Sequence, residues 1–509
     1  MAIEINSAAL YGIEGLLVKV EVDIAKGMPS FNIVGLADTA VKEAKERVRA
    51  AIINSGYTFP IGRITVNLAP ANIKKVGSMF DLPIAIGILA CSGYINEKEL
   101  FNYLFIGELS LSGEIRAVKG ALNLVMEGSK NNIKNFIVPE KNKEECSLIK
   151  EIGIYNFSSL EQCVNFLLFK DCLPYCNSNN EQKPFIQEFD FQDIIGQISC
   201  KRALEIACAG GHNVLMFGPP GVGKTMLAKR VPSIMPPLSY NEAVEVTRIY
   251  SVSGKVHSEE ALIKKRPFRS PHHSSSTYAL IGGGNDLKAG EVTLAHKGVL
   301  FLDELLEFKK ESLEALRQPL EDRLINISRQ SGSVSYPANF MFIGALNPCP
   351  CGKYTFKEFY NQCSCSEKEI ERYLKKLSGP LLDRIDIYTY VAPVNFNDIN
   401  NNVKSEASST IRDRVISARK IQEERFKKNN ISCNAEMTHS HLTKFCILSE
   451  KCTLLMKKIY ETYNLSTRAY DRILKVARTI CDLRGKDLIE EGDIIEAVNY
   501  RKFLDNKIC

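Results

Sequence analysis

Near the middle of this chain of 509 residues stands Gly218-Pro219-Pro220-Gly221-Val222-Gly223-Lys224-Thr225. The apolar run 213–217 before it is typical of a buried strand, and residues 226–229 after it are typical of a helix. Glycines at such a turn let successive backbone N–H groups curl around phosphates, and the helix N-terminus adds positive potential. The stretch therefore predicts a phosphate-binding loop in an α/β domain.

This loop predicts ATP and Mg²⁺ as cofactors. Lys224 is expected to reach the β- and γ-phosphates, and the Thr225 hydroxyl is expected to ligate Mg²⁺. A second segment lies further along the chain, Val299-Leu300-Phe301-Leu302-Asp303-Glu304. Its four apolar residues are typical of a buried strand that ends in two carboxylates. We expect Asp303 to hold the Mg²⁺ shell and Glu304 to polarise the attacking water.

Length and composition indicate a protein of several domains without a membrane span. A chain of this length is too long for one core and favours roughly three domains. The longest apolar run, residues 82–95, is too short and too interrupted by glycine to span a bilayer, so we expect it in a core. No basic segment leads into an apolar one at the N-terminus, and 16 cysteines without a secretion signal favour reduced thiols. These features predict a cytoplasmic protein.

The organisation along the chain follows from shifts in pattern. Apolar runs alternate with a helical segment, residues 39–55, in the first third, and a polar, proline-containing stretch follows. Helical patterns dominate the last fifth, most clearly at residues 412–425 and 467–483. We expect an α+β domain at 1–168, a linker at 169–189, the nucleotide-binding α/β domain at 190–393 and a helical lid at 394–509.

The net charge of +6 comes from the end of the chain. Residues after 400 carry 21 Lys and Arg against 15 Asp and Glu. A basic C-terminal domain permits a nucleic-acid partner without requiring one.

Two further segments carry a family resemblance, Gly344-Ala345-Leu346-Asn347-Pro348 and Ser378-Gly379-Pro380-Leu381-Leu382-Asp383-Arg384-Ile385-Asp386. With them, the chain resembles the magnesium-chelatase-like AAA+ ATPases and, more closely, the ComM (YifB) family of bacterial proteins. The resemblance covers nearly the whole length, including residues 197–211 and 266–273. It implies a P-loop ATPase core with a helical lid, preceded by a domain like that of the Lon protease.

The resemblance also implies roles for three residues. Asn347 matches the sensor that orients the lytic water beside Glu304. Arg384 matches the arginine finger, a cation that one subunit supplies to the γ-phosphate of its neighbour. Arg468 resembles the second sensor arginine. A finger that acts in trans implies a ring, and the resemblance implies a homo-hexamer.

The long interval between Lys224 and Asp303 is explained, on the same resemblance, by an insertion in the second helix of the core. Gly282-Gly283-Gly284, with the basic Arg266 and Arg269, is expected to form a loop that faces a central pore. A second hairpin is expected around residues 326–336, with a turn at Ser331-Gly332. Such loops would grip a threaded or encircled polymer.

Three histidines lie near these segments. His272-His273 has no Cys, Asp or Glu at ligand spacing, which favours a structural or substrate-facing loop over a metal site. His296, just before the second strand, is expected to be a structural histidine.

The N-terminal domain resembles the Lon-type protease fold at residues 107–116 and 136–140. Active members use a serine nucleophile and a lysine base. The alignment places Met79 and Leu122 at those two positions, so we expect no proteolysis. Ser78 and Lys119 lie nearby, and a slip of register would restore the pair. The favoured role of the domain is binding or assembly.

Two Cys-x-Cys pairs, Cys349-Pro350-Cys351 and Cys363-Ser364-Cys365, offer four soft ligands on one loop. Four thiolates suit tetrahedral Zn²⁺, which would stabilise an insertion too small for its own core. A reduced, packed loop is an equal alternative, because a single intervening residue chelates less comfortably than two.

The leading hypothesis is a ring-forming AAA+ ATPase that moves DNA, with the branch-migration helicase activity and the setting in natural transformation and recombination that the resemblance implies. Single-stranded or branched DNA and recombination proteins would then be partners, with no membrane partner. One alternative is the ATPase subunit of a magnesium-chelatase complex, and another is a protein remodeller.

Overall fold

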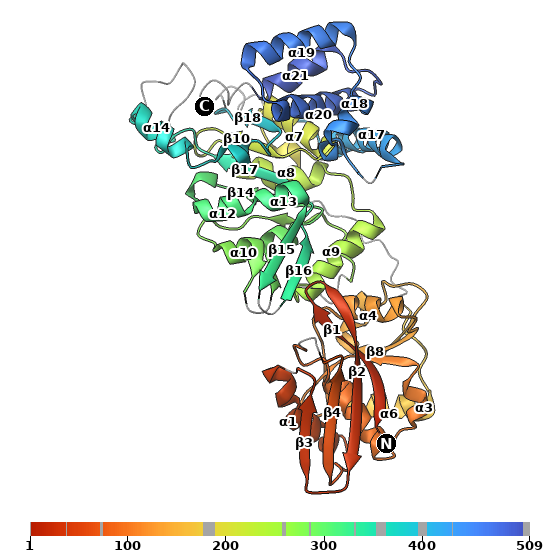
Figure 1. The fold of residues 1–509 in the computed structure, drawn as a ribbon. Helices are drawn as coiled ribbons and strands as arrows, with labels where there is room; N and C mark the ends of the chain where they lie inside the picture. The colour runs from red at the N-terminus through yellow and green to blue at the C-terminus, as the bar shows by residue number, and fades with distance from the viewer. Residues whose placement is uncertain are drawn as a thin grey trace.

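The structure is a computed structural model, and it describes residues 2–36, 38–71, 75–176, 189–256, 261–284, 287–329, 332–352, 363–394, 405–429 and 431–501. Figure 1 shows an elongated molecule, with the N-terminal sheet at one end, the second sheet in the middle and the C-terminal helices at the other end. The predicted α/β class is confirmed.

The N-terminal part is built on a seven-stranded mixed sheet in the order β3-β4-β2-β1-β5-β8-β9. Its strands are β1 (Ile3–Tyr11), β2 (Glu14–Ala25), β3 (Ser30–Val34), β4 (Arg63–Ala69), β5 (Tyr103–Phe105), β8 (Asn135–Pro139) and β9 (Gly153–Phe157). Its main helices are α1 (Thr39–Asn54), α2 (Asp81–Cys91), α4 (Ala121–Lys130) and α6 (Leu160–Phe169). Residues 81–90 of α2 are all buried, so the long apolar run is core, as predicted.

The middle of the molecule holds a parallel five-stranded sheet in the order β11-β14-β17-β10-β18. The strands are β10 (Val214–Phe217), β11 (Phe268–Arg269), β14 (Val299–Leu302), β17 (Met341–Leu346) and β18 (Ile387–Tyr390). Strands β14 and β17 are buried at every position, which explains their continuous apolar sequences. Helices α7 (Ile198–Gly210), α8 (Lys224–Ile234) and α9 (Tyr240–Val252) accompany this sheet.

Two hairpins project from this sheet. The first lies between β11 and β14 and consists of α10 (Thr277–Ile281), β12 (Gly282–Gly283), β13 (Lys288–Ala289) and α11 (Glu291–Leu294). The second is β15 (Leu324–Arg329) with β16 (Gly332–Pro337), and it follows α12 (Lys310–Ala315) and α13 (Arg317–Asp322). The predicted hairpin around 326–336 is confirmed, although its turn residue Ser331 lies outside the described residues.

The C-terminal helices are α17 (Ser408–Phe426), α18 (His439–Phe445), α19 (Glu450–Tyr463), α20 (Thr467–Leu483) and α21 (Glu491–Asn499). Both predicted helices are present, and α17 begins four residues earlier than expected. These helices share one hydrophobic core with α7 and α8. Most of the predicted linker, residues 177–188, lies outside the described residues. Within the described part of the chain, no helix is both long and apolar enough to cross a membrane.

The N-terminal sheet touches the second hairpin. Figure 1 shows the turn between β1 and β2 reaching β15 and β16. Ile13 in this turn is buried in the same core cluster as Val334. Gly12 adopts the left-handed φ of 63°, and an added Cβ would lie 2.0 Å from Val334 Cγ1. The N-terminal domain therefore covers this part of β16.

Candidate ATPase site

The phosphate-binding loop runs from the end of β10 to the start of α8. Gly221 and Gly223 have φ of 79° and 94°, a region that residues with a Cβ rarely adopt, so the glycines permit the turn. Lys224 Nζ donates to Gly218 O at 2.6 Å and to Pro219 O at 2.9 Å. Burial lowers the pKa of Lys224 to about 8. The ammonium is thus held by acceptors within the loop.

The two predicted Mg²⁺ ligands lie together. Thr225 Oγ1 donates to Asp303 Oδ2 at 2.5 Å, although they are 78 residues apart in the chain. Asp303 and Glu304 follow β14 directly, at the carboxyl edge of the sheet where β10 also ends. A hydroxyl and a carboxylate are oxygen ligands of the type that Mg²⁺ prefers.

Asn347 lies at the same carboxyl edge of the sheet. It follows β17, the strand between β14 and β10, and its Oδ1 accepts from Lys224 Nζ at 3.0 Å. The structure therefore brings together the loop, Asp303, Glu304 and Asn347 as the sequence predicts.

His273 contacts Glu304, a relationship that the sequence did not reveal. Its Nδ1 lies 3.3 Å from Glu304 Oε2, and its ring lies against His272 with the centroids 4.1 Å apart. His272 Nδ1 instead pairs with the Ser274 hydroxyl at 2.8 Å. The only sequence signal was the position of this pair just after β11, at the same edge of the sheet. His296 has structural contacts with Glu245 and with the Asn339 N–H, as predicted.

Arg384 lies at the opposite edge of the sheet. It precedes β18, and Asn213, which precedes β10, donates its side-chain amide to Arg384 O at 2.9 Å. Four residues of β10 separate this edge from the phosphate-binding loop, roughly 13 Å of extended chain. The guanidinium bonds Pro380 O at 2.6 Å and pairs with Glu321, while its buried Nε has no partner in the described structure. Burial lowers the pKa of Arg384.

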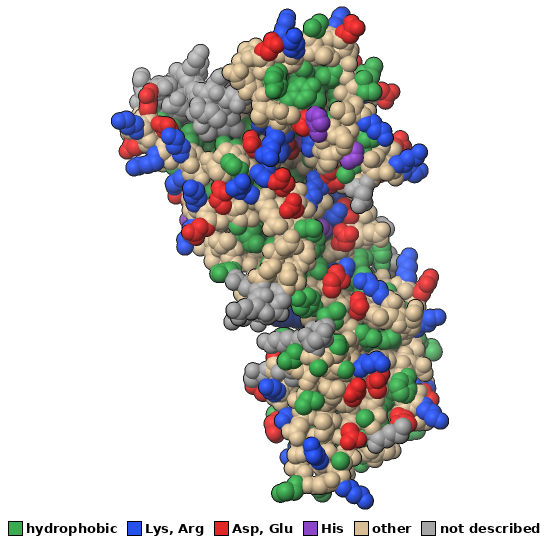
Figure 2. Space-filling view, viewed as in Figure 1, with side chains coloured by type: hydrophobic (Ala, Val, Ile, Leu, Met, Phe, Trp, Pro, Cys, Tyr) green, Lys and Arg blue, Asp and Glu red, His purple; other side chains and the backbone are tan. Residues whose placement is uncertain are grey.

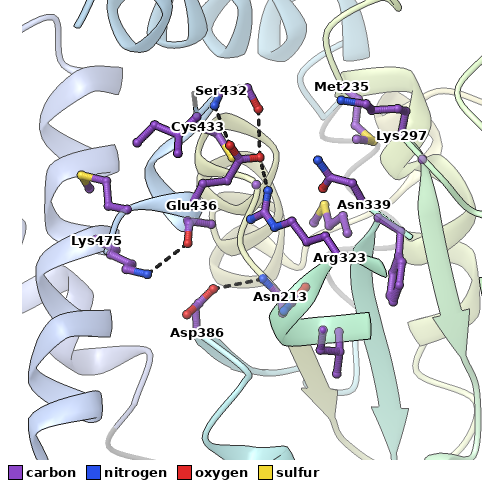
Figure 3. A pocket seen from close by; sticks show the side chains of 18 of the residues that line it. Asn213, Met235, Lys297, Arg323, Asn339, Asp386, Ser432, Cys433, Glu436 and Lys475 are labelled. Carbon is purple, nitrogen blue, oxygen red and sulfur yellow. Dashed lines mark hydrogen bonds and ion pairs between the residues drawn. The ribbon is translucent and has the colours of Figure 1, made fainter. Parts of the chain in front are cut away.

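Arg468 is on the same side as Arg384. Its guanidinium lies 3.9 Å from Asp383, and its side chain is 66% exposed. Both arginines line a cavity of about 900 Å³ between the amino ends of the strands and the C-terminal helices. Figure 3 shows part of this cavity, with Asn213 and Asp386 facing Arg323, Glu436 and Lys475. Neither arginine faces the phosphate-binding loop of its own chain.

A buried network of polar side chains connects α20, one of the C-terminal helices, to this edge of the sheet. Arg472, one turn after Arg468 on α20, pairs with Asp386. His212 is fully buried between Asp386 Oδ2 at 3.3 Å and Thr479 Oγ1 at 2.8 Å. The neighbouring Arg472 charge and the hydrogen bond from His212 hold the pKa of Asp386 far below its usual range, against the effect of burial.

Comparisons with known proteins agree with this geometry. Family models described as magnesium chelatase, subunit ChlI, match residues 190–399, 20–142 and, for its C-terminal part, 405–501. The uncharacterized protein YifB of Escherichia coli is 42% identical over 498 residues, which cover 98% of this chain and 96% of that protein. The competence protein ComM of Haemophilus influenzae is 42% identical over 504 residues, covering 98% and 97%. The chain belongs to the YifB/ComM family. As a member of that family it is an AAA+ ATPase of the magnesium-chelatase type.

The N-terminal domain of this YifB/ComM protein has a more distant relative. Lon protease 2 of Bacillus subtilis is 28% identical over 185 residues, 31% of this chain and 33% of that protein. Met79 and Leu122, at the nucleophile and base positions, are both buried. Ser78 pairs with Glu108, whereas the Lys119 side chain packs on Gly254 of the ATPase core. Within the described residues, Ser78 and Lys119 therefore form no catalytic pair.

The two arginines of the YifB/ComM chain that were expected to belong to a pore loop are bound within the fold. Arg266 donates to Pro236 O at 2.5 Å and to Lys297 O at 2.6 Å, and only 11% of its side chain is exposed. Arg269 on β11 makes a two-pronged pair with Glu291 at 2.5 and 2.7 Å. Both guanidinium groups are bound by carbonyl or carboxylate oxygens of the same chain, so these two residues do not form a basic surface for a polymer.

The four cysteines of the predicted metal site lie together. Their Sγ atoms all fall within 4.8 Å of one another. The YifB/ComM chain therefore has a group of ligands that could hold a metal ion beside the ATPase site. Of the eleven residues between the two pairs, 353–362 lie outside the described structure.

Proposed function

We propose that this protein is a ring-forming AAA+ ATPase that couples ATP hydrolysis to the movement of DNA, as translocation or branch migration. Its family supports the ATPase, and the name of one relative, competence protein ComM, supports a role with DNA. The observation that carries the proposal is the position of Arg384 and Arg468 at the sheet edge opposite Lys224. Each ATP site then needs a second copy of the chain.

A homo-hexamer is the assembly that we propose. In it the edge with Arg384 and Arg468 faces the phosphate-binding loop of the next subunit. The finger supplies positive charge to the γ-phosphate as negative charge develops there. Arg384 is suited to this role because burial and Pro380 hold it in place while its partner Glu321 is 55% exposed and able to release it.

The residues at the first edge fit ATP with Mg²⁺. Lys224 would exchange its acceptors in the loop for phosphate oxygens, and Thr225 and Asp303 would be Mg²⁺ ligands. Bound Mg²⁺ would neutralise phosphate charge. Glu304 then polarises a water molecule held by Asn347. The water oxygen attacks the γ-phosphorus, and Glu304 takes up a proton from this water. The bond to the β–γ bridging oxygen breaks, which leaves ADP and phosphate.

Exposed lysines of the C-terminal helices support contact with the DNA backbone. Several lid arginines are used in internal ion pairs, among them Arg414, Arg425, Arg472 and Arg478. The excess positive charge that reaches solvent therefore comes largely from lysines, and Figure 2 shows blue side chains along this end of the molecule. The exposed lysines on α17, α18 and α19 are Lys420, Lys444, Lys451, Lys457 and Lys458. Such contacts would be salt-sensitive and independent of sequence.

The two hairpins are the parts that we propose move the polymer. They lie side by side, because the Tyr336 hydroxyl of β16 donates to Leu287 O at 2.5 Å and Gly283 lies next to Ile327. The second hairpin leads into β17, which ends at Asn347. A change at the ATP site is thereby linked to both hairpins. We further propose that the Lon-like domain is a binding or assembly module and that recombination proteins are partners.

The test is the ATPase rate at modest salt, without DNA and with single-stranded, duplex or four-way-junction DNA. Glu304→Gln is the blank. We expect stimulation that is largest with single-stranded or branched DNA and that falls as salt rises. An ATPase rate that no DNA changes would be consistent with the ATPase activity and would overturn the proposal that DNA is the polymer moved.

One observation favours a second candidate, the motor of a magnesium-chelatase complex: the matching family models are described by the chelatase subunit ChlI. Mg²⁺ insertion into a porphyrin by a reconstituted mixture would support it. ATP-dependent unfolding of a tagged protein would instead support a remodeller.

Zinc is the third cofactor that we propose. Four cysteine thiolates in one group are the ligand set of structural Zn²⁺ sites.

A further inference from the structure

The four-cysteine cluster has the dimensions of a site for one metal ion. Sγ of Cys349 lies 3.3 Å from that of Cys351 and 3.7 Å from that of Cys363, and Cys351 and Cys363 are 3.6 Å apart. Four sulfurs around one Zn²⁺, at Zn–S distances of about 2.3 Å, would be roughly 3.8 Å apart. Two of the three distances are close to this value. Four sulfurs confined within 4.8 Å enclose one ion rather than a cluster of several metals.

The cluster is built against the nucleotide site. Cys349 is fully buried and lies two residues after Asn347, whose Oδ1 accepts from Lys224. Gly352, directly after Cys351, adopts a left-handed φ of 74° and packs on the phosphate-binding loop. A Cβ added to Gly352 would lie 2.6 Å from Cδ of Pro220. The loop that carries the first cysteine pair thus touches the ATP site through Asn347 and through Gly352.

The second pair of ligands comes from further along the chain. Cys363 and Cys365 precede α14 (Glu367–Leu374), which begins with the Ser366 cap. An ion that joins the two pairs would tie residues 349–352 to the residues that precede α14 and so hold Cys349 to Gly352 in place. Without the ion, only the packing of the four thiols and the other contacts of these residues would hold them in place.

We infer that one Zn²⁺ bound by Cys349, Cys351, Cys363 and Cys365 braces the phosphate-binding loop and Asn347, so that zinc occupancy and nucleotide affinity are coupled. This inference rests on the proposed nucleotide site and not on the proposed DNA client. Binding of the ion releases the protons of the four thiols, and no oxidant or reductant takes part. The coupling is reciprocal: if zinc tightens nucleotide binding by some factor, nucleotide tightens zinc by the same factor.

The first test compares zinc content with nucleotide affinity in the full-length protein purified without chelator. Elemental analysis should find one zinc, and not iron, per chain. The double variant Cys363→Ser/Cys365→Ser should lose it and bind a fluorescent ADP at least about fivefold more weakly, the low end of typical couplings between sites. Cys172→Ser, an exposed cysteine outside the cluster, is the matched control and should change neither value. Absence of zinc from the wild-type protein would overturn the site.

A second variant separates the brace from the metal. Gly352→Ala keeps all four thiols but places its Cβ against Pro220, so it should retain zinc and still weaken ADP binding. ADP should also slow the extraction of zinc by a chelator in the wild-type protein and not in Lys224→Ala. Unchanged ADP affinity in the zinc-free double variant would overturn the coupling. A protein that binds zinc and ADP as expected but ignores DNA would refute the DNA client alone.

Discussion

Tyr11 and Ser333 are 322 residues apart in the chain and share two hydrogen bonds. The Tyr11 hydroxyl donates to Ser333 O at 3.0 Å and accepts from its N–H at 3.1 Å. These bonds join the Lon-like domain to β16, the strand just before β17 and Asn347. A second contact, from the Gly120 N–H to Ser251 O at 3.0 Å, joins the same domain to α9. The Lon-like domain therefore restrains the β15–β16 hairpin through direct hydrogen bonds.

Tyr11→Phe tests this connection. It removes both hydrogen bonds while keeping the ring, so hydrogen exchange of the β15–β16 amides should become about tenfold faster. Tyr460→Phe, an exposed tyrosine on α19, is the control. Equal exchange in Tyr11→Phe and the wild type would contradict the connection.

The two core residues of the ATP site should fail in different ways. Lys224→Ala removes the cation that we propose contacts the phosphates, and it should abolish nucleotide binding. Glu304→Gln keeps the shape of the site and should bind ATP with near-normal affinity, while turnover falls at least about a hundredfold. Equilibrium binding and steady-state turnover separate the two effects. Turnover by Glu304→Gln at the wild-type rate would refute the role of Glu304.

His273 is expected to position Glu304. Its removal in His273→Ala should lower kcat roughly tenfold with little change in nucleotide affinity, because only the orientation of the carboxylate is lost. His439→Ala is the control, since that exposed histidine lies on α18 and pairs with Asp471. Equal kcat values for the two variants would show that the contact with Glu304 has no role.

The buried network at Asp386 is expected to hold α20 against the sheet edge that carries Arg384. Asp386→Ala leaves Arg472 and His212 without their shared partner and should cost about 3–5 kcal/mol of stability. Lys375→Ala removes an exposed pair with Glu371 and should cost at most about 1 kcal/mol. Thermal unfolding measures both. Similar losses in the two variants would contradict a structural role for the network.

The sequence predicted the features that depend on neighbouring residues. The glycines of the loop, the apolar strand before Asp303 and the periodicity of 467–483 each specify local structure, and all three are present. Arg266 and Arg269 were misjudged because a sequence does not show that an arginine is already paired, here with Glu291 in the case of Arg269.

Contacts between residues far apart in the sequence could not be predicted, for a related reason. The contact of His273 with Glu304, the docking of Tyr11 on Ser333 and the position of Arg468 on the side of Arg384 all depend on how strands are ordered in the sheet and where the lid packs. The family resemblance gave Arg384 its expected role, but only the strand order shows that its edge lies opposite Lys224.

The most direct test of the central claim, that each ATP site is completed by the neighbouring subunit, is the ATPase rate of mixed variants. Lys224→Ala and Arg384→Ala should each be inactive alone. Mixed rings should regain activity, because a site with an intact Lys224 can then face an intact Arg384. A mixture of Lys224→Ala with Glu304→Gln is the control and should stay inactive, since both lesions lie on the same side of the site. No recovery in the first mixture would contradict the account.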